Sequence, residues 1–251
     1  MELTLHIYLF ILGAILGSFY NVVGLRVPAG ESIVSPGSHC PACNKNLTWM
    51  ELIPILSFFL QKGRCRNCAT KISPVYPFYE ALTACLFTIS PLLVGWSKEL
   101  PIALALISLL IIITVSDLST MLIPDKVLLF FLPLFILLTV ISPLTPWWDS
   151  IVGAVVGFGI LLLIAIVSKG GMGGGDIKLF GVLGIVLGLT GVFVALFIAS
   201  FLGAVVGIAA RMGKKVEKGS PIPFGPFIAI GSLISYFFHN SIIEWYIQLL
   251  F

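Results

Sequence analysis

The chain has 251 residues, of which 59% are hydrophobic and only 10% are charged, and its formal net charge is +3. A soluble globule of this length carries far more charge, so the composition excludes that class and predicts an all-α, polytopic membrane protein surrounded by the lipid bilayer. The small net charge does not indicate a nucleic-acid partner, because in a membrane chain the placement of Lys and Arg matters more than their sum.

Eight apolar segments follow one another, and we expect about eight transmembrane helices from them. The first, near residues 4–25, has no basic region before it and is long enough to span, so we interpret it as a retained helix and not as a signal peptide. The sixth and seventh are separated only by Gly188-Leu189-Thr190-Gly191, and this region can be miscounted. After the first, the segments lie near residues 76–95, 101–116, 127–142, 150–168, 179–189, 191–210 and 226–250.

Basic residues gather in every second connection between these segments. With the amino terminus outside, thirteen of the fourteen Lys and Arg residues fall in cytoplasmic connections, and only Lys98 is left outside. Cytoplasmic loops of membrane proteins are enriched in Lys and Arg, so we expect this orientation. The cytoplasmic connections are then those near residues 26–75, 117–126, 169–178 and 211–218.

The first cytoplasmic connection carries two CxxC pairs, Cys40 with Cys43 and Cys65 with Cys68, twenty-one residues apart. In a reducing compartment such pairs indicate a tetrahedral four-thiolate zinc site; two disulfides are the alternative. Four sulfur ligands leave no open coordination position, so the Zn²⁺ is expected to be structural. Cys85 lies inside the second segment, where we expect a small buried residue.

Two acidic residues stand at the ends of long apolar segments on the predicted cytoplasmic face: Asp117 after the third and Asp176 before the sixth. A carboxylate near bilayer depth is costly and is rarely kept without a partner or a function. Two neighbouring carboxylates share a proton, so the ionised one can activate water while the protonated one polarises a scissile carbonyl. The pair predicts an aspartic endopeptidase with Asp117 and Asp176 as its catalytic residues.

Each aspartate also has a structural interpretation. Asp117 can be a helix-end residue solvated by lipid headgroups, and Asp176 can be the N-cap of the following helix, although capping and catalysis are not exclusive. The histidines, His6, His39 and His239, are scattered along the chain, so no Ser/His/Asp or Cys/His arrangement is indicated.

A run of glycines, Gly170-Gly171-Met172-Gly173-Gly174-Gly175, precedes Asp176. Glycines permit close backbone approach, so we expect a tight, mobile loop that brings Asp176 beside another helix or an extended substrate. Gly173, Gly175 and Lys178 are the expected residues of this substrate-binding or active-site loop. A phosphate-binding loop is the competing interpretation, but it requires a preceding β-strand, and here a membrane helix precedes.

Several further motifs occur in an order that resembles type IV prepilin peptidases, from residue 11 to about residue 230. The ending Gly-x-Gly-Asp also resembles the signature of the wider group of intramembrane aspartyl proteases. The motifs are Gly17-Ser18-Phe19-Tyr20-Asn21-Val22-Val23 with Arg26 and Pro28, the two CxxC pairs, Tyr76-Pro77 with Glu80, Asp117 before Ile123-Pro124-Asp125, Gly173-Gly174-Gly175-Asp176-Ile177-Lys178-Leu179, and Pro223-Phe224-Gly225-Pro226-Phe227.

The resemblance implies an enzyme of the bacterial cytoplasmic (inner) membrane. It would cut the basic leader from prepilins or pseudopilins at the cytoplasmic face, after a glycine, with Asp117 and Asp176 in the catalytic roles. Many members then methylate the new amino terminus with S-adenosylmethionine. The chain looks most like the Gram-positive enzymes that process competence pseudopilins. Many relatives have an Asp where this chain has Ser119, which favours Asp117 as the catalytic acid.

We expect three parts in the chain: a first transmembrane helix (1–25), a cytoplasmic zinc loop (26–75) and a membrane-embedded peptidase core (76–251). No glycine-rich methyltransferase turn is visible, so a methyl-donor site would have to be built from the cysteine loop and helix ends. Asn21 and Glu80 can line such a site, or can instead form interhelical hydrogen bonds.

A transporter that uses the two aspartates as an ion or proton relay is the alternative function. It predicts acids near the bilayer midplane and repeats between the halves of the chain, and the sequence shows neither. A zinc-dependent scaffold without catalysis would leave the two acids unexplained.

Overall fold

The computed structural model describes residues 2–169, 171–213 and 222–250. In these ranges the chain forms helices and two isolated β-bridges but no β-strand, which confirms the predicted all-α class. The elements in order are α1 (Glu2–Arg26), the 3₁₀-helix η1 (Trp49–Leu52), α2 (Leu56–Leu60), α3 (Val75–Val94), α4 (Leu100–Thr120), α5 (Asp125–Ile141), α6 (Asp149–Val167), α7 (Gly174–Met212) and α8 (Gly225–Leu250).

The long helices present a surface suited to lipid. Six of the described helices, namely α1, α3, α4, α6, α7 and α8, are long and apolar enough to cross a membrane, and α5 is as apolar but has 17 residues. Large apolar side chains cover the outside of the bundle, for example Val167 and Phe197, which are 75% and 73% exposed. A surface of this kind needs hydrocarbon around it, so the chain is a multi-pass membrane protein.

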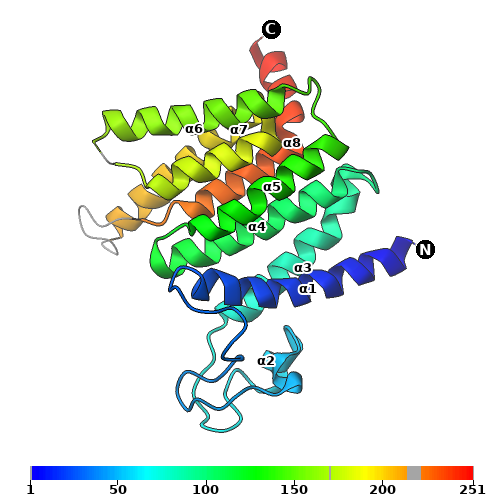
Figure 1. Cartoon of the computed structure of the whole chain (residues 1–251), viewed down its shortest axis with the longest axis vertical. Coiled ribbons are helices and arrows are strands. Elements are labelled where there is room, and N and C mark those ends of the chain that lie inside the picture. Colours follow the sequence, from blue (N-terminus) through cyan, green and yellow to red (C-terminus); the bar gives the residue numbers. More distant parts are fainter. Residues whose placement is uncertain (1, 170, 214–221, 251) are drawn as a thin grey trace.

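The predicted sixth and seventh segments are the two parts of α7, which divide at Gly188 with no longer loop between them. A Cβ at Gly157 would lie 2.8 Å from the Phe180 carbonyl oxygen and 3.4 Å from Val192 Cγ1, although twelve residues span about 18 Å in a straight helix. The helix therefore folds back on itself at Gly188, where φ is 66° and ψ is −177°. Both ends of α7 lie on the left of Figure 1 as a result.

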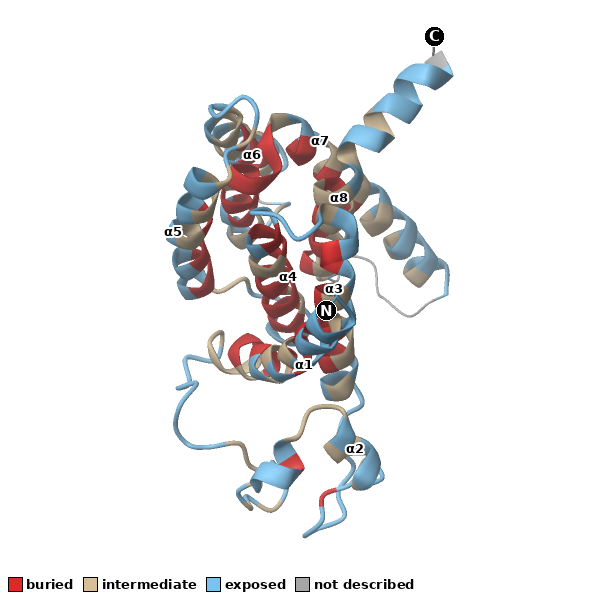
Figure 2. Cartoon of the chain, turned by 90° about the vertical axis from the view of Figure 1, so that its right-hand side faces the viewer, coloured by how far each residue is buried: buried red, intermediate tan, exposed pale blue. Residues whose placement is uncertain are grey.

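Helix α4 forms the centre of the bundle. It is apolar all round, and side chains such as Leu106 and Leu109 are fully buried. Figure 2 shows the buried residues concentrated along this helix. Helix α1 approaches it closely because Gly24 leaves room for Val115: a Cβ at Gly24 would lie 2.7 Å from Val115 Cγ1.

One end of the bundle collects the segments that carry the predicted chemistry. The end of α4 and the beginnings of α5, α7 and α8 lie together on the left of Figure 1, and the segment of residues 27–74 lies below the bundle. Residues 214–218 of the predicted fourth cytoplasmic connection lie outside the described ranges. The orientation across the membrane and the division into three parts stay predictions.

Candidate active site and metal centre

Asp117 is buried in the last turn of α4. The helix continues to Thr120, four residues beyond the predicted end of the third segment, and Asp117 is only 6% exposed. Its Oδ2 accepts a hydrogen bond of 2.6 Å from the backbone amide of Gly225, the first residue of α8. The interpretation of Asp117 as a solvated helix end is therefore wrong, because the start of α8 closes over the carboxylate and its amide holds the oxygen.

Asp176 lies in the first turn of α7 and is half-buried. The N-cap of this helix is Gly173 and not Asp176, which is the third helical residue. The Asp176 carboxylate folds back over the cap, since a Cβ at Gly173 would lie 3.0 Å from Asp176 Oδ2. The expected mobile loop is also shorter than predicted: Gly174 and Gly175 belong to the helix, and Gly170 lies outside the described residues.

Gly175 allows α7 to approach the turn between α4 and α5. A Cβ at Gly175 would lie 2.7 Å from Ile123 Cβ, whereas a Cβ at Gly174 would meet nothing within 4 Å. Through this contact the structure holds the first turn of α7, which carries Asp176, at the end of the bundle where α4 ends with Asp117. A buried and a half-buried carboxylate thus lie at the same end of the bundle, on α4 and α7, and form the candidate site together with the beginning of α8.

Lys178 pairs with Asp125 at the start of α5. Its Nζ lies 2.8 Å from both Asp125 carboxylate oxygens, and both side chains are more than half exposed. An exposed pair of this kind contributes little to stability. Its effect is geometric, because it joins the first turns of α5 and α7 beside Asp176.

The four predicted metal ligands form one cluster. All four sulfurs lie within 4.8 Å of one another, with 3.7 Å between Cys40 and Cys68 and 4.0 Å between Cys43 and Cys65. Tetrahedral Zn–S bonds of about 2.3 Å place sulfurs about 3.8 Å apart, whereas a disulfide needs about 2.0 Å. The cysteines are free thiols, so the cluster fits a metal ion and the disulfide alternative is wrong.

The two CxxC pairs adopt the same kind of turn, each with its own backbone hydrogen bond. The amide of Cys40 donates to the Lys45 carbonyl, and in the second pair the amide of Cys65 donates to the Thr70 carbonyl. The Thr70 hydroxyl and amide hydrogen-bond the Cys68 sulfur and lower the pKa of that thiol to about 6, so the thiolate predominates at neutral pH. Thiolates are the form that binds metal, and the donor set fits a soft divalent ion.

The fifth cysteine does not follow its prediction. Cys85 is exposed on the outer surface of α3 and is not a buried residue of the helix interface. The sequence marked it as apolar but could not show which side of α3 faces the neighbouring helices.

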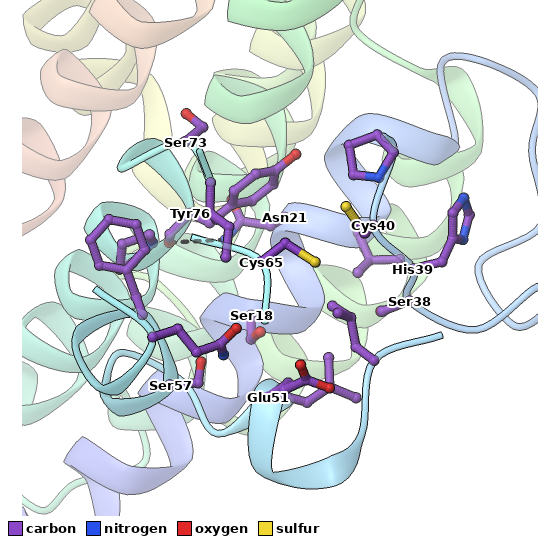
Figure 3. Close-up of a pocket in the computed structure, with 18 of the residues that line it drawn as sticks. Ser18, Asn21, Ser38, His39, Cys40, Glu51, Ser57, Cys65, Ser73 and Tyr76 are labelled. Carbon is purple, nitrogen blue, oxygen red and sulfur yellow. Dashed lines mark hydrogen bonds between the residues drawn. The ribbon is translucent and has the colours of Figure 1, made fainter. Parts of the chain in front are cut away.

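A cavity of ≈ 420 Å³ lies between the end of α1, the segment of residues 27–74 that carries the four cysteines (the cysteine segment) and the beginning of α3 (Figure 3). Both polar positions singled out in the sequence line it. Asn21 Nδ2 donates to the Tyr76 carbonyl at 3.2 Å, and Glu80 Oε2 accepts from the Ile55 amide at 2.7 Å. Ile55 has a φ of 63°, a strained value for a β-branched residue, so Glu80 holds the cysteine segment against the bundle in an unfavourable backbone conformation.

Sequence reasoning missed Glu51, which lines the same cavity and is 6% exposed. Its Oε2 accepts hydrogen bonds from the Thr48 amide and hydroxyl, at 2.9 and 2.8 Å, and these bonds lower the pKa of Glu51 below its usual range. The spacing Thr48-x-x-Glu51 is a capping-box signal that could have indicated this local structure.

The sequence matches two known families of domains. Residues 11–94 match the bacterial peptidase A24 N-terminal domain, and residues 104–208 match the type IV leader peptidase family.

Curated relatives match nearly the whole chain. The prepilin leader peptidase/N-methyltransferase of Bacillus subtilis (strain 168) is 48% identical over 96% of this chain and 97% of its own length. Proteins of the same name from Aeromonas salmonicida (strain A449) and Neisseria gonorrhoeae are each 32% identical, over 95% and 94% of this chain and 92% and 93% of their own lengths. No solved structure shows a significant match.

Proposed function

The chain belongs to the type IV prepilin leader peptidase family, and from this premise we propose that it cuts the basic leader from prepilins or pseudopilins by an aspartyl mechanism and then methylates the new amino terminus. The observation that supports the aspartyl mechanism is the burial of Asp117 beneath the Gly225 amide, at the end of the bundle where α7 begins with Asp176 in its first turn.

The chemistry assigned to the pair requires one carboxylate and one carboxylic acid. The ionised member takes a proton from a water molecule, whose oxygen attacks the scissile carbonyl carbon, while the protonated member hydrogen-bonds the carbonyl oxygen. The proton then passes to the leaving nitrogen as the C–N bond breaks. The Gly225 amide fixes the position of Asp117 Oδ2 at the start of α8.

The four cysteines would hold a structural Zn²⁺ in the cytoplasmic segment. Four thiolates complete the coordination, so the ion would fold the segment and leave the hydrolysis to the aspartates. The methyl donor would be S-adenosylmethionine. The site, the cysteine segment and the leader of the substrate would all lie on the cytoplasmic side of the bacterial cytoplasmic membrane.

The transporter alternative receives no support from the positions of the acids. Asp117 and Asp176 lie at helix ends, not near the middle of a crossing where a relay would be expected.

The proposal is tested by incubating a prepilin-like substrate, with its basic leader and apolar helix, with the wild type and the Asp117→Asn and Asp176→Asn variants in detergent or lipid. We expect both substitutions to lower cleavage by at least about a thousandfold, because each removes one of the two proton-transferring groups.

Glu31→Gln is the matched control, since it makes the equivalent change from acid to amide at an exposed position outside the aspartate site. Full cleavage by either active-site variant would show that the pair is not catalytic.

A further inference from the structure

The cavity between α1, the cysteine segment and α3 has no part in the proposed cleavage. Its volume of ≈ 420 Å³ is that of a small-molecule site. The lining combines charges of both signs with aromatic rings: Glu51 and Glu80, Arg26 and Lys71, Phe58 and Tyr76.

Two buried side chains of the lining have an oxygen without a hydrogen-bond partner. Asn21 is 3% exposed and its Oδ1 is unpaired; Glu51 is 6% exposed and its Oε1 accepts no hydrogen bond, with Lys45 Nζ 3.7 Å away. Unpaired buried acceptors are rare in folded proteins. Figure 3 shows Asn21 and Glu51 on opposite sides of the space around Ser18. The cavity is therefore suited to a ligand with hydrogen-bond donors and a positive charge.

Resting on the proposed function, we propose that this cavity binds the methyl donor, S-adenosylmethionine, with Asn21 and Glu51 accepting its hydrogen bonds. The ligand is a nucleoside with an ammonium and a sulfonium group, which suit the Glu51 carboxylate, and its adenine ring suits the aromatic faces of Tyr76 and Phe58. Its single carboxylate suits the cationic side of the lining.

The cavity is linked through α1 to α4, the helix that carries Asp117. Leu25 and Arg26 line it, and the preceding residue of α1, Gly24, packs directly on Val115, two residues before Asp117. A new amino terminus formed at the aspartates would therefore not have to cross the bundle to reach the cavity.

The methyl transfer needs only the new amino terminus and S-adenosylmethionine. The new amino terminus first loses a proton to water. Its nitrogen lone pair then forms a bond to the methyl carbon while the C–S bond breaks, and the electron pair of that bond stays on sulfur. The positive charge moves from sulfur to the methylated nitrogen, and the spent donor is the neutral thioether S-adenosylhomocysteine.

Equilibrium dialysis of the full-length, zinc-loaded protein with S-adenosylmethionine tests the proposal. The Glu51→Gln variant removes the charge but keeps the capping box with Thr48, because glutamine serves equally well there. We expect this variant to raise the Kd about tenfold, the loss of one charge-assisted contact. Glu31→Gln makes the same change outside the cavity and should leave the Kd unchanged.

A second variant covers the case in which Glu51→Gln also loses zinc. Tyr76→Leu removes the aromatic face but keeps the backbone carbonyl that holds Asn21, and we expect it to raise the Kd at least about fivefold. An unchanged Kd in a folded Glu51→Gln variant, or in Tyr76→Leu, would overturn the assignment.

Leader cleavage measured in the same samples separates the two proposals. A wild type that cuts the leader but does not bind S-adenosylmethionine would overturn this inference alone, and a wild type that does not cut the leader would overturn the proposed function.

Discussion

Asp117 and Glu80 show how single side chains join distant parts of this molecule. Asp117 accepts from Gly225, 108 positions further along the chain, and Glu80 accepts from Ile55 in the cysteine segment. Each of these carboxylates holds a backbone amide at the edge of a functional region. At this scale the glycines matter as well, because Gly175 has no side chain to keep α7 away from Ile123.

Gly175→Ala should lower leader cleavage at least about tenfold. The added Cβ would lie 2.7 Å from Ile123 Cβ and would push the first turn of α7, with Asp176, away from the α4–α5 turn. The neighbouring Gly174→Ala is the control, because its Cβ meets nothing within 4 Å. Cleavage rates of the two variants check the prediction, and equal rates would show that this close approach does not position Asp176.

The folded-back helix α7 is the element on which the site depends. Its reversal at Gly188 returns the chain to the end of the bundle from which α8 starts, and α8 supplies the amide that holds Asp117. The Asp149 carboxylate of α6 stabilises the reversal by accepting from Leu189 N at 3.1 Å. Gly153 and Gly157 leave part of one face of α6 without side chains, so the two halves of α7 can pack closely against it.

Gly188→Ala should destabilise the protein by at least about 2 kcal/mol. A backbone with φ of 66° and ψ of −177° belongs to glycine, and a Cβ there would also collide with the Asp149 carboxylate. Thermal unfolding in detergent measures the effect. Gly181→Ala in the same helix should unfold near the wild-type temperature, because its Cβ would make an ordinary contact of 3.4 Å with Phe158; a similar loss in both variants would contradict the prediction.

At the scale of the whole molecule, the two proposed functional regions are supported by different parts of the structure. The aspartate site is built from α4, α7 and α8, whereas the cavity depends on a segment of 27–74 that contains only η1 and α2 as helices. Cys40 and Cys65 are both metal ligands in the proposal and part of the cavity lining. The two regions should therefore respond differently to metal removal.

Chelation of zinc should abolish methylation while some leader cleavage remains. Without the metal the cysteine segment is no longer held folded, so one wall of the cavity is lost. The aspartates lie in a different part of the structure and do not depend on the metal. Metal analysis should find one zinc per chain, and trypsin should cut the chelated protein at Lys62 or Arg64 within the segment. Cys85→Ser, outside the cluster, should keep both zinc and activity. A reduced, purified sample without zinc would contradict the prediction.

The orientation is tested with fusions to green fluorescent protein, which fluoresces in the cytoplasm but not after export through the membrane unfolded. A fusion after Thr120 should be bright and one after Val94 dark, because the predicted orientation places the α4–α5 turn inside and Lys98 outside. The reverse pattern would place the aspartates on the outer face.

The sequence by itself determined the all-α membrane class, the apolar segments and the four-cysteine motif. These are properties of contiguous segments, since hydrophobicity and ligand spacing are written locally along the chain. It also singled out both aspartates as a pair; of the structural alternatives that it left open, a solvated helix end for Asp117 and an N-cap for Asp176, the structure supports neither.

Only the tertiary structure decided which residues meet. The cover of Asp117 by Gly225, the reversal of α7 and the cavity around Glu51 depend on packing between segments far apart in the chain. Such contacts are set by which faces of the helices can approach, as at Gly24 and Gly175, and the local sequence does not record which partner each face will find.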